Sequence, residues 1–156
     1  MADSVSKWKS GQNPTAGTPS VGFPYADFTW NGLDGAGSAD DTNSHAALTS
    51  EVLDYPGRYF TLVINAGADT IGGTADVVYT LYGSNDRDLA IAKWDVVKTA
   101  TLASATITDL VTFVEINTEN DEAYYKYYKL KLDPSADVGP TCTIKVGVNA
   151  PAKNKG

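Results

Sequence analysis

The chain has 156 residues, of which 42% are hydrophobic and 20% are charged, and this composition is typical of one globular domain with a hydrophobic core. Nineteen acidic residues against twelve lysines and arginines give a formal net charge of −7. This charge disfavours nucleic acids and anionic membranes as partners, because both repel an acidic protein at long range. No apolar stretch approaches the roughly 20 residues of a membrane-spanning helix. We also expect no signal peptide, because the start, MADSVSKWKSG, lacks an apolar run.

Residues 1–24 are expected to form an extended N-terminal arm that precedes the domain. The stretch SGQNPTAGTPSVGFP is rich in glycine, proline, serine and threonine, and each proline removes a backbone donor and fixes φ. Trp8 stands between Lys7 and Lys9, which suggests an anchor that fills a pocket of a partner protein. Residues 150–156, APAKNKG, are expected to form a short basic tail.

The stretch between these two ends, residues 25–149, is expected to fold as a single all-β domain. Eight segments have the residue types or the alternation of short strands; in chain order they are DFTW, AALTS, RYFTLVINAG, ADVVYTLYGS, KWDVVKTATL, VTFVEINT, YYKYYKLKLD and TCTIKVGV. Turn signals such as YPG, GSND and DPSADVGP separate them. About eight antiparallel strands with these turns predict a β-sandwich or a jelly roll.

Alternation also predicts which side chains face the core. In RYFTLVINAG the set Phe60, Leu62 and Ile64 is uniformly apolar, which is typical of a half-buried strand. In TCTIKVGV the apolar set includes Cys142, so its thiol is expected to be a small buried hydrophobe. A single cysteine excludes an internal disulfide framework.

An enzyme is not expected. The only histidine is His45, and no sequence pattern marks a serine or Cys142 as a nucleophile beside it. One cysteine and one histidine are too few for a zinc cage. Neither of the glycine-rich phosphate-binding templates occurs. We therefore predict no catalytic residue, no metal ligand and no cofactor.

Carboxylates occur in clusters at 40–41, 86–88 and 119–122. A glycosidase would hold two of them about 5–10 Å apart across a cleft. These lie in turn-like stretches beside Asn, Gly and Ser, where aspartates cap their own turns, so solvated turns are the favoured interpretation. Calcium in the loop 34–43 is an alternative, although its spacing does not match an EF-hand.

The strand YYKYYKLKLD carries four tyrosines and three lysines. With a period of two, the face that ends in Leu130 and Leu132 is expected to point inward. The other face would carry Tyr125, Tyr127, Lys129 and Lys131 in solvent. Aromatic and basic residues together are typical of single-strand nucleic-acid binders, but an RNP-like pattern is missing and the net charge is negative. A protein–protein contact is the favoured role of this face, because tyrosine is enriched at interfaces.

The order of these strands resembles β-sandwich modules of tailed-phage virion proteins, and also discoidin-like and galactose-binding-like jelly rolls. The similarity lies within residues 55–149 and is carried by Tyr82, Gly83, Ser84, Asn85, Asp86, Trp94 and the strand Tyr124–Leu132. It implies a structural virion protein, a decoration or cement protein on the surface of a bacteriophage capsid, made in the host cytoplasm. Its partners would be the major capsid protein and neighbouring copies of itself, for which we expect a homo-oligomer and guess a trimer.

A carbohydrate-binding module is the alternative interpretation, since loop aromatics can stack on sugar rings. Trp30 stands at the mouth of the loop that begins at Asn31 and is the candidate glycan contact. Packing at the rim of the sandwich is nevertheless the favoured role for Trp30. Trp94 follows an apolar stretch and is expected to be buried.

Overall fold

In the computed structural model of the chain, the residues described are 4–9, 24–31, 46–57, 59–65, 76–103, 111–117, 125–135 and 141–149. They form ten strands and one 3₁₀ turn, Ile91–Lys93. The strands are β1 (Ser4–Val5), β2 (Tyr25–Asn31), β3 (Leu48–Thr49), β4 (Leu53–Asp54), β5 (Tyr59–Asn65), β6 (Val77–Ser84), β7 (Asp95–Leu102), β8 (Val111–Asn117), β9 (Tyr127–Pro134) and β10 (Thr141–Asn149).

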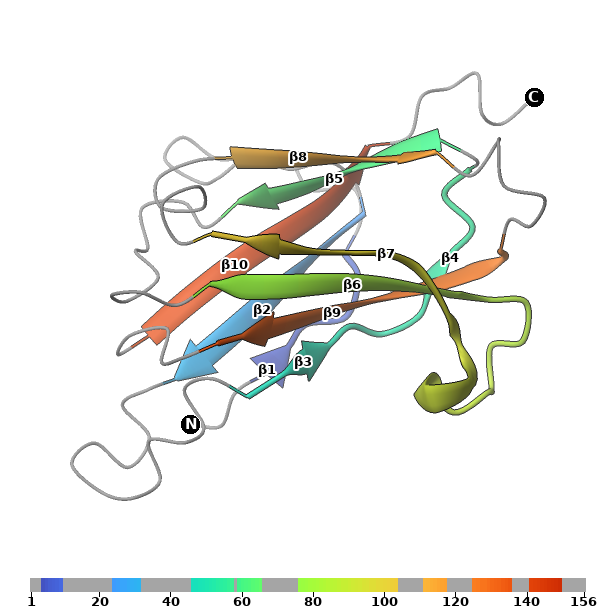
Figure 1. Cartoon of the computed structure of the whole chain (residues 1–156), viewed down its shortest axis with the longest axis horizontal. Coiled ribbons are helices and arrows are strands. Elements are labelled where there is room, and N and C mark those ends of the chain that lie inside the picture. The colour runs from blue at the N-terminus through green and yellow to red at the C-terminus, as the bar shows by residue number, and fades with distance from the viewer. Residues whose placement is uncertain are drawn as a thin grey trace.

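These strands make two antiparallel sheets that pack face to face (Figure 1). The first sheet has the order β1-β2-β10-β5-β8, and the second has the order β3-β9-β6-β7, with β4 also paired to β9. The prediction of an all-β antiparallel sandwich is confirmed. The long strands fall on the expected segments, whereas AALTS contributes only the two residues of β3.

The core lies between the sheets and follows the alternation of the strands. In β5, Phe60, Leu62 and Ile64 are each 1% exposed or less, as the period of two predicts. The inward sets of the other strands join them, and they include Phe28, Trp30, Tyr79, Leu81, Leu130, Leu132, Ile144 and Val146. Because full burial of a side chain of this size stabilises a protein by about 1.5–3 kcal/mol, these alternating residues specify the fold.

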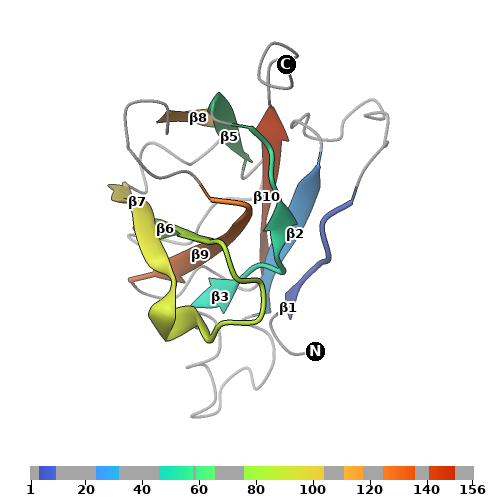
Figure 2. The ribbon, with the colours of Figure 1, turned by 90° about the vertical axis from the view of Figure 1, so that its right-hand side faces the viewer.

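Residues 4–9 lie along β2 as an edge of the first sheet. Ser4 pairs with Thr29 and Val5 with Phe28, and a further bridge joins Lys9 to Tyr25. Figure 2 shows β1 beside the short strand β3 of the second sheet. This part of the expected arm is thus part of the sandwich, because Val5 and Trp8 pack against its core. Residues 10–23 and the tail 150–156 lie outside the described residues, so an extended arm there stays a prediction.

The strands β7 and β8 are edge strands, and they lie at the ends of the two sheets opposite β3 and β1 (Figure 2). The pairing of β6 with β7 shifts register between Leu81 and Tyr82, which inserts Val97 as an extra residue that packs against the core. The neighbouring Lys98 pairs with the inward residue Leu81. Its ammonium group donates to the Glu115 carbonyl in β8 at 3.1 Å. This hydrogen bond joins the edge strand of the second sheet to the edge strand of the first.

Candidate functional site

The outer face of the second sheet carries the densest arrangement of the predicted partner-binding residues. Lys129 of β9 is opposite Tyr82 of β6, and Tyr82 is opposite Val96 of β7. We call this surface the lysine–aromatic face; it consists of Tyr82, Trp94, Val96, Tyr127, Lys129 and Lys131. Val96 is 57% exposed and is the most exposed large hydrophobic residue of the part of the chain that the structure describes.

Both lysines of this face lie over aromatic rings. The Lys129 ammonium is 5.0 Å from the centre of the Trp94 ring, and the Lys131 ammonium is 5.8 Å from that of Tyr82. Such contacts contribute about 0.5–1 kcal/mol at exposed sites. Among the described residues, no carboxylate forms an ion pair with either ammonium group. Two positive charges are therefore held in place, and are available to a partner, on a chain with a net charge of −7.

Threonines extend this face beside the lysines. The Thr80 and Thr99 hydroxyls are 3.1 Å apart across β6 and β7, and Lys131 lies opposite Thr80 on the other side. Thr49 of β3 pairs with Lys131 and is exposed. Thr80 is buried, and the Thr99 hydroxyl also donates to the Tyr79 carbonyl at 3.1 Å, so these two hydroxyls are bonded within the sheet.

Tyr125 does not lie on this face, so that part of the prediction is wrong. Its ring packs against the core and against Gly83, where an added Cβ would overlap the ring. Its hydroxyl donates to Asp95 Oδ2 at 3.0 Å. The alternation fails here because β9 begins only at Tyr127, after a bend at Lys126. Tyr124 lies outside the described residues.

The residues at the N-terminus that were predicted to bind a partner have contacts within this chain. The Trp8 Nε1 donates to the Glu51 carbonyl at 2.8 Å, and the ring is partly buried against the core. The Lys9 ammonium donates to Asp27 Oδ2 at 3.2 Å. Lys7 is exposed. The Trp8 ring thus packs against its own chain, and a contact of Trp8 with a partner stays a prediction.

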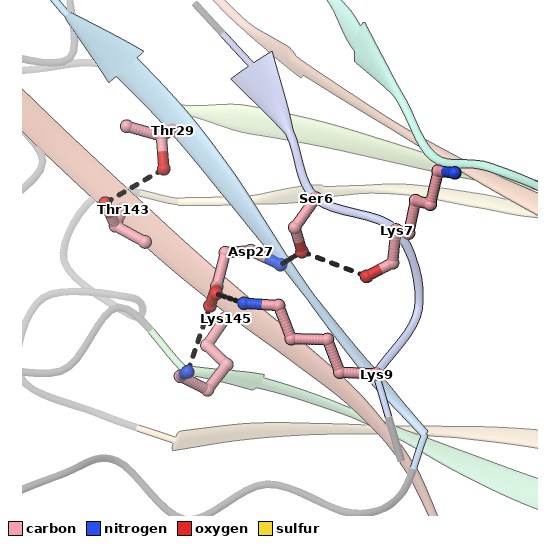
Figure 3. Close-up of polar contacts among 7 residues, drawn as sticks. All are labelled: Ser6, Lys7, Lys9, Asp27, Thr29, Thr143 and Lys145. Carbon is pink, nitrogen blue, oxygen red and sulfur yellow. Dashed lines mark hydrogen bonds and ion pairs between the residues drawn. The ribbon is translucent and has the colours of Figure 1, made fainter.

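Asp27 is the centre of a polar cluster on the outer face of the first sheet (Figure 3). Its two carboxylate oxygens contact two lysines, with Oδ2 3.2 Å from Lys9 and Oδ1 3.0 Å from Lys145. Its backbone amide donates to the Ser6 hydroxyl at 2.9 Å. Both ammonium groups also lie over the Tyr25 ring, at 5.6 Å and 4.5 Å. This cluster fastens residues 4–9 to β2 and β10.

Trp30 cannot be the glycan contact, because its side chain is 0% exposed. The ring is part of the core, and its Nε1 donates to the Ala46 carbonyl at 2.8 Å. A sugar needs an exposed aromatic face, so the prediction for this residue is wrong. Trp94 is buried as predicted, at 5% exposed, but it lies on the lysine–aromatic face with its Nε1 bonded to the Leu89 carbonyl.

A hollow of about 420 Å³ opens at one end of the sandwich. Trp8, Val52 and Leu53 form part of its apolar lining, and charged residues of both signs surround them, including Lys7, Asp54 and Arg87. Arg87 and Asp54 are 3.7 Å apart and are both well exposed. Among the described residues that line it, no three acidic, histidine or cysteine side chains are placed to hold a metal ion.

Of the residues considered for catalysis, the structure describes the side chains of Asp86 and Asp88. In the described part of the chain, no group of three or more histidine, cysteine or acidic side chains is placed to hold a metal ion. Asp86 caps its own turn, since its Oδ1 accepts from the amide of Asp88 at 3.0 Å; this confirms a turn role for that pair. His45, the loop 34–43 and the carboxylates of 119–122 lie outside the described residues. Burial raises the pKa of Tyr79, which belongs to the core.

Comparisons with known proteins found no match for this chain. The chain matches no family model, no curated protein and no solved structure. No helix in the described ranges is long and apolar enough to cross a membrane.

Sequence reasoning missed Asp27, Lys145 and Tyr82 as site residues. Alternation alone places Asp27 and Lys145 outward on their strands, but it does not show that β2 and β10 are neighbours. Only the observed register brings Asp27 opposite Lys145, and only the pairing of β6 with β9 places Tyr82 beside Lys129.

Proposed function

We propose that this chain is a structural protein of a virion, which decorates a phage capsid by docking on the major capsid protein. The observation that carries the proposal is the lysine–aromatic face, where two ammonium groups are held over aromatic rings. The partner surface would be acidic and would face Lys129, Lys131 and the exposed Val96.

Three physical features favour docking through this face. Each lysine already rests on a ring, so binding restricts little further side-chain freedom, which otherwise costs up to about 2 kcal/mol for a lysine. Tyrosine and tryptophan are common at the centres of interfaces. The face also belongs to the three neighbouring strands β9, β6 and β7, so it presents a rigid surface.

The virion assignment rests on the resemblance of the strand order and of the Gly83–Asp86 turn to phage β-sandwich modules. A decoration protein needs a rigid domain and contacts with several neighbours, and it needs no active site. The sandwich supports the first of these, and the lysine–aromatic face offers a surface for one such contact. The glycan-binding alternative has lost its candidate residue with the burial of Trp30.

The test is to purify phage particles on a density gradient from cells that produce this chain. The copy number of the chain in the particles is then measured against the major capsid protein. We expect the chain to sediment with the particles in a fixed ratio. A chain found only in the soluble fraction contradicts the proposal. Binding of the purified chain to a glycan array would instead support the alternative.

A further inference from the structure

The hollow of about 420 Å³ at one end of the sandwich has the size and the lining of a site for a small molecule. Sites that hold small ligands have volumes of about 300–1,000 Å³, with apolar walls and a few polar groups that orient the ligand. Four of the eight lining residues are apolar, including Trp8, Val52 and Leu53, and the other four are charged. The hollow therefore offers both kinds of contact that such a ligand requires.

Three segments that are distant in the sequence build this hollow, and each of them is held in place. The Trp8 Nε1 donates to the Glu51 carbonyl at 2.8 Å, so the indole ring of the first segment is fastened to the second. The second segment contains β4, which pairs with β9. In the third, the Asp86 amide donates to the Ser84 hydroxyl at 3.0 Å and fixes the turn before Arg87. The hollow is thus formed before a ligand arrives, which lowers the entropic cost of binding.

Trp8 supplies an aromatic surface to the hollow. Its side chain packs partly against the core and stays partly exposed, whereas Trp30 is 0% exposed and Trp94 is 5% exposed. Trp8 is therefore the most exposed of the three tryptophans. An indole ring is a large apolar surface, and the C–H groups on one face of a sugar ring pack well on such a surface.

The charges around the hollow balance one another. Lys7 and Arg87 are positive, and Glu51 and Asp54 are negative. Arg87 and Asp54 form a loose ion pair of 3.7 Å. Lys7 points away from Asp27 (Figure 3), and among the described residues neither its ammonium group nor the Glu51 carboxylate forms an ion pair. One half of this rim would repel a ligand with a net charge, whereas the hydroxyl groups of a neutral ligand both donate and accept hydrogen bonds.

We propose that the hollow binds a neutral sugar, with one sugar ring packed on Trp8 and the hydroxyl groups bonded to Glu51 and Arg87. The carboxylate accepts from hydroxyl groups and the guanidinium donates to them, and hydrogen bonds to charged groups are the stronger ones. The inference does not rest on the proposed function, because no residue of the hollow belongs to the lysine–aromatic face. On a capsid, this site would attach the particle to a surface glycan. In a chain that is absent from particles, it would favour the carbohydrate-binding alternative.

A glycan array of neutral and acidic oligosaccharides tests the site with the purified full chain. The variant Glu51→Gln/Arg87→Gln keeps the net charge and changes two exposed residues of the hollow. The control Glu115→Gln/Lys93→Gln makes the same changes at two exposed residues outside it. We expect wild type and the control to bind neutral glycans, and the hollow variant to lose at least about tenfold in affinity with an unchanged melting temperature. Binding to no neutral glycan, or equal binding by the folded hollow variant, overturns the proposal.

The indole signals of the tryptophans give a second readout that requires no loss of binding. The ¹⁵N-labelled wild-type chain is titrated with the neutral glycan that binds most strongly on the array, and a Trp8→Phe variant assigns the Trp8 signal. We expect a saturable shift of the Trp8 signal, with the signals of Trp30 and Trp94 unchanged. A titration that leaves the Trp8 signal unmoved overturns the proposal.

The two docking hypotheses fail separately in these experiments. Neither experiment contains capsids, so a chain that binds no sugar leaves the capsid assignment untouched. Conversely, Lys129→Glu/Lys131→Glu changes only the lysine–aromatic face and should bind sugar as wild type does. A loss of sugar binding in this folded variant would place the sugar on the lysine–aromatic face and would overturn the assignment to the hollow.

Discussion

At the scale of single residues, the environment of Gly83 explains why Tyr125 leaves the outer face. The Tyr125 ring lies against the backbone of Gly83, where any Cβ would overlap it. The ring also forms an edge contact with Tyr128, with the ring centres 6.2 Å apart. The hydroxyl reaches Asp95 at the start of β7. One glycine therefore allows a tyrosine to connect the beginnings of β9 and β7 at the end of the core.

Substitution of Gly83 should reveal this packing. Gly83→Ala is expected to lower the free energy of unfolding by about 1–3 kcal/mol, because the methyl group overpacks the site. Urea unfolding measures the change. In the double variant with Tyr125→Ala the added methyl group should cost much less than it does alone. A Gly83→Ala variant as stable as wild type would show that the ring does not occupy this position in solution.

The Asp27 cluster should contribute more than an exposed ion pair. Asp27→Ala leaves Lys145, whose side chain is 16% exposed, without its counter-charge, and about 1–3 kcal/mol of stability should be lost. Asp54→Ala is the matched control. Its partner Arg87 is 3.7 Å away and both side chains are more than half exposed, so the loss should stay below about 1 kcal/mol. Equal losses in thermal or urea unfolding would mean that the cluster does not fasten β1.

At the scale of elements, one face of β9 packs in the core and the other carries the lysines of the lysine–aromatic face. Tyr128, Leu130 and Leu132 are at most 1% exposed, whereas Lys129 and Lys131 lie over rings on the other face. The eight residues of β9 thus supply the core on one side and the lysine–aromatic face, our proposed docking surface, on the other. Their aromatic and basic composition is explained by these two tasks, without a nucleic-acid partner.

The edge strand β7 should depend on Lys98 to remain unpaired. An inward-pointing charge on an edge strand discourages pairing with another chain, and here the ammonium also binds the Glu115 carbonyl. Lys98→Leu is expected to increase association, seen as a larger sedimentation coefficient at high concentration. Lys93→Leu, an exposed lysine in the 3₁₀ turn, is the control for lost charge. If both variants sediment like wild type, Lys98 does not protect this edge.

At the scale of the whole molecule, the sequence predicts the sandwich well because core burial enforces the period of two. In β5, and in β10 from Ile144 to Val148, the apolar residues face inward as expected; the Cys142 side chain lies outside the described residues. The prediction of where a side chain lies fails where that position depends on the register between strands or on the residue at which a strand begins. The start of β9 at Tyr127 moves Tyr125 inward, and the pairing of residues 4–9 with β2 depends on contacts such as that between Lys9 and Asp27, which are far apart in sequence. The strand DFTW was predicted, but the polar residues that follow Trp30 suggested a glycan contact at the strand end, whereas the side chain is buried.

The central claim is that the lysine–aromatic face docks an acidic surface of a capsid, and charge reversal tests it most directly. The double variant Lys129→Glu/Lys131→Glu is compared with the control Lys93→Glu/Lys126→Glu. The control makes the same change of charge at two exposed lysines outside the lysine–aromatic face. Occupancy on capsids stripped of the chain is measured by quantitative gel or mass spectrometry, with melting temperatures as a check on folding. We predict that the first variant loses at least about tenfold in affinity, equivalent to about 1.4 kcal/mol, while the second binds nearly as well as wild type. Equal binding by the two folded variants would contradict the claim.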